Sequence, residues 1–225
     1  MEVVYEDNHL IIVNKAPGEI VQGDKTGDKP LSEIVKDWIK EKYAKPGNVF
    51  CGVTHRLDRP VGGLVVFAKT SKALSRMNEM FREGKVDKTY WAITKECPPK
   101  EEDTLVHYIS TVERNNKSYA YTTEKKGSLK SILKYKLIAK SDNYNLLEVN
   151  LLTGRKHQIR VQLSTIGCPI KGDLKYGAKR SNPDGSISLF ARRIQFIHPV
   201  SGKEIDVTAP LPNDSLWQAF AKQFE

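Results

Sequence analysis

Short apolar runs divided by polar turns make up the first third of the chain. Val3–Tyr5 and Leu10–Val13 are strand-sized and flank a polar turn, as in two adjacent strands. Apolar residues then recur at helical spacing from about Leu31 to Tyr43, and Asp28 is a candidate cap for that helix. Gly63–Lys69 begins with glycine and continues as an apolar run, which predicts a buried strand.

A second helix is predicted directly after that strand. Thr70 can cap its N-terminus, and Leu74, Met77 and Phe81 then fall on one face. Gly84 is placed to end the helix. A stripe of this composition is typical of core packing, so we expect it to face the interior.

Strand patterns predominate in the rest of the chain. Lys88–Thr94 is a predicted strand, and several more lie within Leu105–Leu152, where Lys125-Lys126-Gly127 is predicted as the tip of a hairpin. A short helix is expected over His157–Ile166. The remaining predicted elements are the turn Asn182-Pro183-Asp184-Gly185, the strands Ser188–Phe196 and Ile205–Thr208, and a closing helix Asp214–Phe224.

These elements together predict an α+β fold. Strands outnumber helices and short turns separate many of them, so we expect a mixed, largely antiparallel central sheet flanked by helices. A chain of 225 residues with 39% hydrophobic and 8% aromatic side chains can bury a core of its own. We therefore expect one domain over residues 1–225.

The N-terminus and the cysteines indicate where such a protein works. The first residues are acidic rather than basic, and the longest apolar runs, Leu10–Val13 and Leu64–Ala68, are far shorter than a membrane span. Cys51, Cys97 and Cys168 are odd in number and far apart, which argues against a disulfide framework or a zinc site. We expect a soluble cytoplasmic protein with no membrane association and no bound metal.

The charge balance permits a nucleic-acid partner. Lys and Arg number 36 against 27 acidic residues, giving a formal net charge of +9 and a pI near 9.3. A basic surface attracts polyanions through counterion release. Many soluble proteins are mildly basic without binding nucleic acid, so charge alone does not decide the function.

The first candidate for chemistry is Asp58, which lies in the segment His55-Arg56-Leu57-Asp58-Arg59 just before an apolar strand. Neighbouring cations favour the ionised form of a carboxylate, as a nucleophile or general base requires. The glycines that follow allow a substrate or backbone to approach closely. Taken by itself, an Asp between two Arg residues is more often a structural ion pair.

Two further clusters contain chemically useful residues. In Leu152–Arg160, His157 and Arg160 share one side of a predicted helix, and a helix N-terminus bearing Arg and Gln can bind phosphate. In Lys88-Thr89-Tyr90-Trp91, a tyrosine on a strand can stack on an extruded base. Alone, the first is more often an exposed basic turn and the second a half-buried core tyrosine.

Taken together and in order, these segments resemble the RluA family of pseudouridine synthases, over nearly the whole chain. His55-Arg56-Leu57-Asp58 is similar to the family's catalytic motif, and Lys88-Thr89-Tyr90 to its K-x-Y element. The other matching segments are Tyr5–Leu10, Val13-Asn14-Lys15 with Pro17-Gly18, Thr153–Val161, Pro169–Asp173 with Tyr176-Gly177, His198-Pro199, and Ala209-Pro210-Leu211-Pro212.

The resemblance implies the pseudouridine synthase fold and the cofactor-free isomerisation of specific uridines in ribosomal or transfer RNA. Asp58 would be the catalytic carboxylate, Tyr90 would stack on the target base, and Arg160 would pair with Asp58. Arg56 would contact the RNA backbone or hold the flipped nucleotide. The other expected RNA contacts are His55, Lys88, Arg155, His157 and Gln158.

The chemistry is consistent with a single carboxylate. The N1–C1′ bond of uridine breaks, the uracil rotates, and a C5–C1′ bond forms, so no redox partner or metal is needed. The carboxylate could attack C1′ to give an ester, or take a proton from C2′ to give a glycal. Ordinary glycoside hydrolysis generally uses two carboxylates and a water.

The chain departs from the family pattern in three places. Val61-Gly62-Gly63 stands where Thr-Ser-Gly is frequent, and Phe190 where His is frequent. Many relatives also carry an N-terminal RNA-binding S4 domain, and here the catalytic motifs begin at residue 3. We therefore expect a catalytic domain without S4, acting as a monomer.

Two other functions compete with this prediction. A non-catalytic RNA-binding or chaperone protein would share the fold but form no product, and its RNA binding would survive Asp58→Asn. A kinase-like phosphotransferase is suggested by H-R-L-D, but the Gly-rich loop, the V-A-I-K lysine and D-F-G that kinases need are missing from the sequence.

Overall fold

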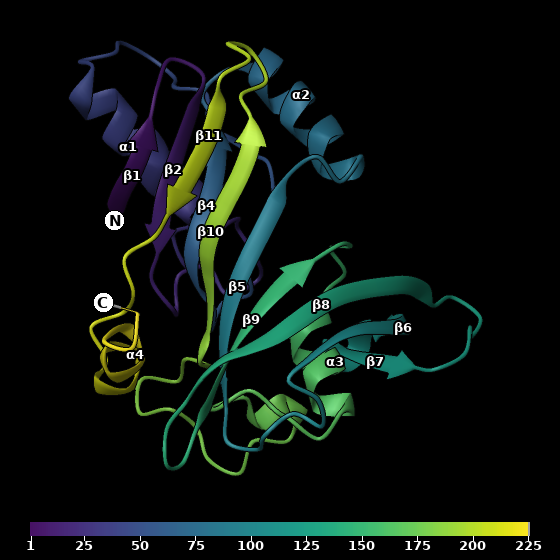
Figure 1. Cartoon of the computed structure of the whole chain (residues 1–225). Helices are drawn as coiled ribbons and strands as arrows, with labels where there is room; N and C mark the ends of the chain where they lie inside the picture. Colours follow the sequence, from purple (N-terminus) through teal and green to yellow (C-terminus); the bar gives the residue numbers. More distant parts are fainter. Residues whose placement is uncertain (225) are drawn as a thin grey trace. The chain divides into compact units, whose positions relative to one another are not determined.

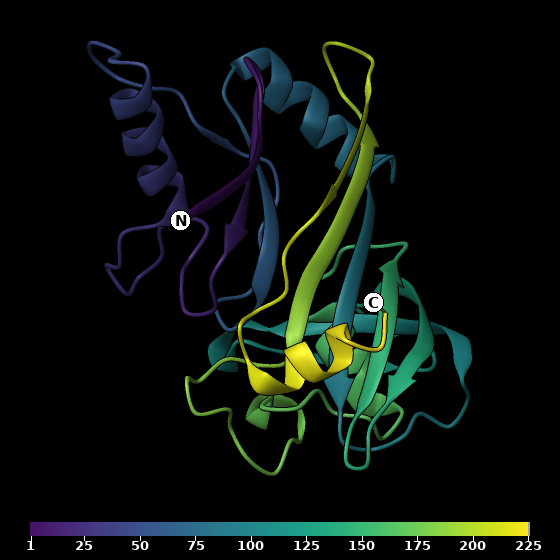
Figure 2. The same ribbon diagram turned by 60° about the vertical axis from the view of Figure 1, so that its left-hand side comes forward.

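Antiparallel strand ladders form the framework of the protein. The computed structural model describes residues 1–224, and the chain divides into two units. The first unit comprises Met1–Val86 and Ala191–Pro210, and the second comprises Asp87–Phe190 and the segment from Leu211 onward. Figures 1 and 2 show the elements of each unit.

Strands at the two ends of the chain build the sheet of the first unit. Its order is β1-β2-β4-β10, with β11 pairing with β10 and β3 pairing with β4. The bounds are β1 Glu2–Glu6, β2 Leu10–Lys15, β3 Gly52–Val53, β4 Gly62–Ala68, β10 Leu189–Ile197 and β11 Glu204–Thr208. The first two residues of β10 belong to the second unit. Every residue of β4 is buried, as its continuous apolar pattern predicts.

Two helices accompany this sheet, α1 (Leu31–Lys42) and α2 (Ser71–Arg82). The Thr70 hydroxyl accepts a hydrogen bond from the backbone N–H of Ala73 at 3.2 Å, which confirms the predicted cap of α2. The prediction that Asp28 caps α1 is wrong. Pro30 occupies the N-cap position without a side-chain bond, and Asp28 instead pairs with Arg59.

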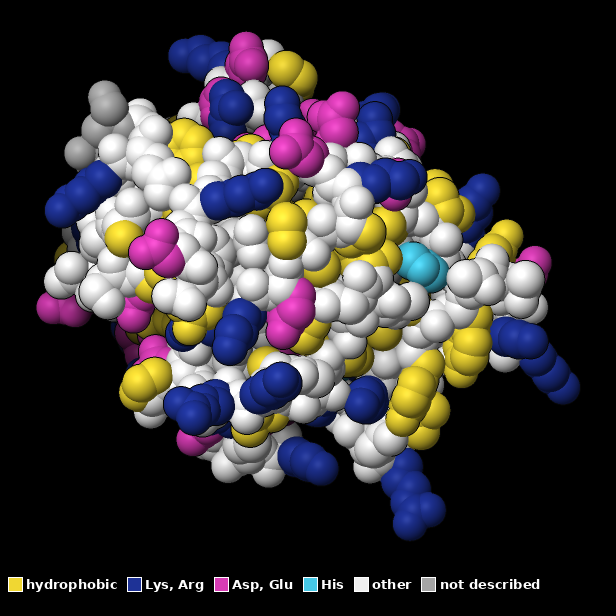
Figure 3. Space-filling view, turned by 60° about the horizontal axis from the view of Figure 1, so that its bottom comes forward, with side chains coloured by type: hydrophobic (Ala, Val, Ile, Leu, Met, Phe, Trp, Pro, Cys, Tyr) yellow, Lys and Arg dark blue, Asp and Glu magenta, His cyan; other side chains and the backbone are white. Residues whose placement is uncertain are grey.

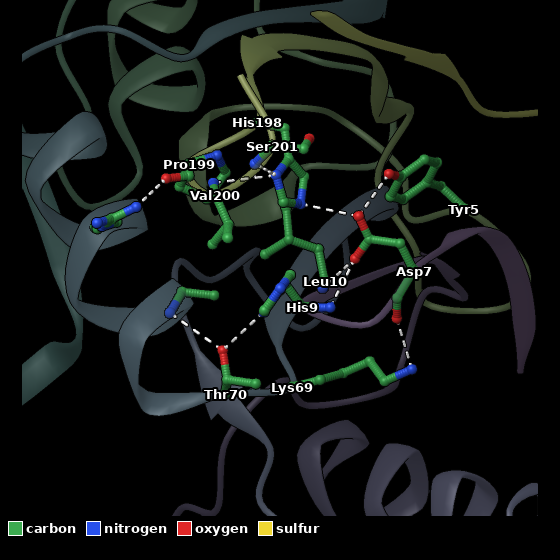
Figure 4. Close-up of polar contacts among 12 residues, drawn as sticks. Tyr5, Asp7, His9, Leu10, Lys69, Thr70, His198, Pro199, Val200 and Ser201 are labelled. Atoms are coloured by element: carbon green, nitrogen blue, oxygen red, sulfur yellow. Dashed lines mark hydrogen bonds and ion pairs between the residues drawn. The ribbon is translucent and has the colours of Figure 1, made fainter. Parts of the chain in front are cut away.

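A buried histidine connects the β1–β2 turn to the β10–β11 turn (Figure 4). The Nδ1 atom of His198 accepts from the backbone N–H groups of Val200 and Ser201, at 3.1 and 2.9 Å. Its proton therefore lies on Nε2, which is 2.9 Å from the Asp7 carboxylate. Asp7 also accepts from the backbone N–H groups of His9 and Leu10.

The second unit has its own antiparallel order, β5-β9-β8-β6-β7. Its strands are β5 Asp87–Thr94, β6 Glu102–Val112, β7 Lys117–Tyr121, β8 Leu129–Lys140 and β9 Asn145–Leu151. The α-helices are α3 (Gln158–Thr165) and α4 (Ser215–Ala221), and the single 3-10 turns are η1 (Glu113–Asn115) and η2 (Leu174–Tyr176). These elements confirm the predicted α+β class with an antiparallel sheet.

The turn at Lys125-Lys126-Gly127 is present but does not close a hairpin. The backbone N–H of Ser128 donates to the carbonyl of Lys125 at 2.9 Å, and Gly127 has a positive φ of 77°. However, β6 lies between β7 and β8 in the sheet, so this connection passes from one side of β6 to the other. The hairpin prediction is wrong because strand neighbours here are not sequence neighbours.

Both helices of the second unit begin close to their predicted starts. The Asp214 carboxylate accepts from the backbone N–H groups of Leu216 and Trp217, which caps α4. Before α3, His157 adopts the left-handed conformation with φ 56°, rare for a residue with a side chain. No helix within residues 1–224 is long and apolar enough to cross a membrane.

Candidate active site

Asp58 lies in the loop between β3 and β4 of the first unit. The loop is anchored at both ends: the Thr54 hydroxyl donates to the carbonyl of Val66 at 2.7 Å, and the Val61 N–H donates to the carbonyl of Asp58 at 3.0 Å. Leu57 is buried, whereas Asp58 itself is half-buried. The backbone at Asp58 is thus held in place while its side chain lies at an intermediate depth.

Lys15, the last residue of β2, binds the backbone of this same loop. Its side chain is 1% exposed, and its ammonium donates to the carbonyls of Val61 at 2.7 Å, Arg59 at 3.2 Å and Ala16 at 3.0 Å. Burial lowers the pKa of Lys15 from 10.5 to about 8. A buried cation therefore stabilises the turn immediately after Asp58.

His55 also contributes to the loop's structure. Its Nε2 atom accepts a hydrogen bond from the backbone N–H of Val66 at 3.1 Å, and its ring lies 4.8 Å from the ring of Phe81. A ring nitrogen that accepts from an amide carries no proton, so His55 is neutral in this arrangement. Arg56, next in the chain, is exposed.

Gly63, the last residue of Val61-Gly62-Gly63, lies at a position that requires glycine. Its φ is +112°, and a Cβ atom built there would lie 2.4 Å from the carbonyl oxygen of Ala191 in β10. Both the backbone angle and the contact require glycine. The entry of the loop into β4 therefore keeps the glycine that the family pattern has at this position.

In the second unit, β5 carries Lys88 and Tyr90. Tyr90 is buried and lies opposite Val149 of β9. The Lys88 ammonium lies beside the loop before α3, because a Cβ atom built on Gly154 would be 3.5 Å from it. Burial lowers the pKa of Lys88. The K-x-Y and T-G-R segments are thus neighbours in space.

Arg160 of α3 belongs to a buried ion pair. Its Nε and one Nη donate to the two carboxylate oxygens of Asp173, at 2.7 and 2.9 Å, and both side chains are almost fully buried. Its guanidinium also lies 5.0 Å from the ring centre of Tyr176. The carboxylate and the ring together fix the plane of the guanidinium.

Tyr176 connects this pair to His157. The Tyr176 hydroxyl accepts from the backbone N–H of Ser118 at 2.8 Å and lies 2.7 Å from His157 Nδ1. A single hydroxyl thus holds both the backbone of β7, at Ser118, and the imidazole ring of His157. His157 and Arg160 therefore face the same tyrosine, although His157 precedes the helix rather than belonging to it as predicted.

Gln158 orders the loop that precedes α3. Its side-chain oxygen accepts from the backbone N–H of Arg155 and from the Thr153 hydroxyl, both at 2.9 Å, and its amide donates to the carbonyl of Ile132 at 3.1 Å. Gln158 is buried and Arg155 is exposed. In this cluster the side chains of Arg155 and Lys156 are exposed, whereas His157, Gln158 and Arg160 are buried.

Each unit therefore brings together part of the predicted set. The first holds His55, Arg56 and Asp58 on one loop, and the second holds Lys88 and Tyr90 beside the cluster at the start of α3. The sequence did not single out Lys15 or Asp173 as site residues. Their motifs were visible, but no local pattern indicates which backbone or guanidinium a buried side chain will bind.

The surface carries the positive charge expected from the composition. Lys and Arg side chains are spread across the face shown in Figure 3, interspersed with acidic and hydrophobic ones. Within residues 1–224, no group of three or more His, Cys, Asp or Glu side chains is arranged to hold a metal ion.

Comparisons with known proteins agree with these motifs. A family model described as RNA pseudouridylate synthase matches residues 9–165. The tRNA pseudouridine synthase C of Vibrio parahaemolyticus is 30% identical over 243 residues, covering 100% of this chain and 95% of that protein. The ribosomal large subunit pseudouridine synthase D of Zymomonas mobilis is 31% identical, covering 95% of this chain and 70% of that protein.

A solved structure supports the fold. Human RNA Pseudouridylate Synthase Domain Containing 4 matches with a TM-score of 0.79 at 23% identity, over 94% of this chain and 89% of that one. At that identity the match concerns the fold alone. Combined with the family model and the two sequence relatives, it leads to one conclusion: the chain belongs to the RNA pseudouridylate synthase family, as an RluA-type member.

Proposed function

We propose that this chain isomerises specific uridines of ribosomal or transfer RNA to pseudouridine, with Asp58 as the catalytic carboxylate. The observation that carries the proposal is the Asp58 loop: a half-buried carboxylate on a backbone bound by the buried Lys15. A held carboxylate keeps its position through bond breaking and reformation, which an isomerisation requires. The proposal includes a monomeric, cytoplasmic enzyme that works without a cofactor.

One carboxylate can account for the whole reaction. Asp58 either attacks C1′ as the N1–C1′ bond breaks, or removes the C2′ proton, and the detached uracil then rotates. When C5 bonds to C1′, the ester bond to Asp58 breaks in the first route, and the proton returns to C2′ in the second. The hydrogen on C5 then leaves as a proton and N1 gains one, so atoms and charge balance. Water must be excluded while the uracil is detached, because its attack at C1′ would give hydrolysis.

Tyr90 and Arg160 have proposed supporting roles. Tyr90 is a buried aromatic residue on a strand, and such a ring can stack on a flipped uracil. Arg160 is proposed to pair with Asp58 and keep it ionised. A guanidinium has five N–H donors, and Asp173 orients this one through two of them.

The other predicted contacts are proposed to bind RNA from each unit. Arg56 and Arg155 are exposed and suited to phosphate contacts. Lys88 lies beside the same loop as Arg155. His55, His157 and Gln158 make the intramolecular bonds described above, so their proposed contribution is to hold these loops in an RNA-binding shape.

The RNA class can be determined by mapping pseudouridines. The two relatives described above are named for tRNA and for the large ribosomal subunit, so both RNAs must be examined. Carbodiimide mapping of total RNA, from cells with and without the gene, should reveal one or a few sites that vanish. Wild-type protein should restore them, and Asp58→Ala should not.

A protein that only binds RNA would behave differently. It would change no site in cells, and purified wild-type protein would form no pseudouridine on unmodified ribosomal or transfer RNA transcripts. That pair of results would refute the proposed function. A site that is unchanged in cells but modified in the purified reaction would instead identify a second enzyme acting at the same position.

A further inference from the structure

One face of the β6–β7–β8 sheet carries aromatic and basic side chains that the proposed chemistry does not use. The opposite face packs on α3: Ile109 and Val161 belong to one hydrophobic cluster, Ala120 packs against that cluster, and Gln162 binds His107. Because side chains alternate along a strand, the residues between them point the other way. We call this second set the tyrosine face: Val106, Tyr108, Tyr119, Tyr121, Lys130 and Lys134.

The tyrosine face is open to solvent. Val106 is 45% exposed and Tyr119 is 36% exposed, although both lie within strands. Tyr108 and Tyr121 are directly paired across β6 and β7, so their rings are neighbours. At the β5 end of the same unit, by contrast, Trp91 packs against Phe224 at 5.2 Å.

Lysines lie next to the tyrosines. Lys130 is directly opposite Tyr108 in the β6–β8 ladder, and Lys134 follows on the same side of β8. The acidic residues Glu102 and Glu148 lie opposite Lys136 in the strand register, further along β8. In these ladders, Lys130 and Lys134 have no carboxylate directly opposite them, and they lie in the part of β8 toward Tyr108.

We propose that the tyrosine face binds a single-stranded stretch of the RNA substrate. Tyr108, Tyr119 and Tyr121 would stack on successive bases, while Lys130 and Lys134 would contact phosphates. Stacking on aromatic side chains tolerates any base, whereas lysines match the charge of the backbone. Tyr119 and Tyr121 are two residues apart on one strand, about 7 Å, a separation that an extended strand of RNA can follow. The inference rests on the proposed RNA substrate.

Binding of a labelled oligouridine of about 12 nucleotides, followed by fluorescence anisotropy, tests the stacking part. Replacing Tyr119 and Tyr121 together by Ala should raise Kd about tenfold, and replacing both by Phe should leave it within about twofold. Tyr43→Ala removes an exposed tyrosine from the first unit and should leave Kd unchanged. Circular dichroism of each variant checks folding.

The salt dependence of binding provides a second, independent test, and it uses lysine substitutions that should not affect folding. Lys130→Gln with Lys134→Gln should reduce the slope of log Kd against log salt by roughly 0.7 for each lysine. Lys40→Gln, on the exposed side of α1, is the matched control and should leave the slope unchanged.

Turnover separates this inference from the proposed function. At saturating RNA the Tyr119/Tyr121 alanine pair should keep the wild-type kcat and show a raised KM, while Asp58→Ala should bind oligouridine normally and lose kcat. If Asp58→Ala stays active, the proposed function fails but the binding result stands. Wild-type Kd and KM in the alanine pair would overturn the inference. So would a dimer in sedimentation that this pair abolishes, because the face would then hold a second copy.

Discussion

A buried lysine is the residue that most directly controls the catalytic loop. Lys15 ends β2 and donates to the carbonyls of Arg59 and Val61, on the far side of Asp58. Its side chain takes no part in the proposed chemistry. It positions the backbone that carries the carboxylate, so its loss should affect folding and catalysis together.

Replacing this lysine tests that role. Lys15→Met keeps the length of the side chain but leaves buried carbonyls without donors, which should cost about 1–3 kcal/mol of the free energy of unfolding. The measurement is urea unfolding. Lys36→Met, at a largely solvated ion pair on α1, is the control and should change stability by less than about 1 kcal/mol.

The lowered pKa of Lys15 adds a pH dependence with a definite sign. Between about 8 in the folded protein and 10.5 in the unfolded chain, the unfolded chain binds the extra proton, so stability rises with pH. From pH 7.5 to 9.5 the wild type should gain about 2 kcal/mol relative to Lys15→Met. A difference that stays constant or shrinks would contradict the assigned burial effect.

Tyr90 offers a test at the target base. Tyr90→Phe retains an aromatic ring and should bind the substrate RNA normally, whereas Tyr90→Leu should lose roughly 1–3 kcal/mol of binding free energy. Filter binding of the mapped RNA substrate measures both. Equal affinities for the Phe and Leu variants would argue against stacking.

At the scale of elements, a buried ion pair connects α3 to the residue before η2 inside the second unit. Arg160 belongs to α3, and Asp173 immediately precedes η2. Removing one member of a buried ion pair takes a compensating charge away from the other, which is more harmful than breaking an exposed pair. The geometry of Arg160 therefore depends on a residue outside its own helix.

The two kinds of pair can be compared in this chain. Asp173→Asn should lower the free energy of unfolding by about 3–5 kcal/mol, because Arg160 would remain charged and buried. Asp206→Asn breaks the exposed pair with Arg193 and should cost at most about 1 kcal/mol. Urea unfolding of both variants provides the comparison, and similar losses would refute the special role of Asp173.

Local sequence patterns predicted which helices and strands form better than they predicted helix caps and the bonding partners of side chains. Helix α2 follows from Thr70 and the apolar spacing after it, and β4 from its continuous apolar run. The prediction that Asp28 caps α1 failed because Pro30, two residues later, occupies the N-cap position. The left-handed His157 has no sequence signal of its own, since its conformation depends on the Gln158 and Tyr176 bonds around it.

At the scale of the whole molecule, the features that the sequence did not predict are contacts between segments far apart along the chain. The order β8-β6-β7 places β6 between two strands that the turn at Gly127 connects, and a hairpin pattern cannot show this. Asp58 was found from a local motif, whereas Lys15 acts across 46 residues, on Val61. Family membership nevertheless followed from the sequence because the motifs recur in order along nearly the whole chain.

The most direct test of the account uses RNA transcribed with tritium at C5 of uridine. Forming the C5–C1′ bond expels that hydrogen, so wild-type protein should release tritium from its substrate RNA. Asp58→Asn, which keeps the shape of the side chain, should bind the RNA equally well and release none. Tritium release by Asp58→Asn at a rate near that of the wild type would contradict the assignment of Asp58 as the catalytic carboxylate.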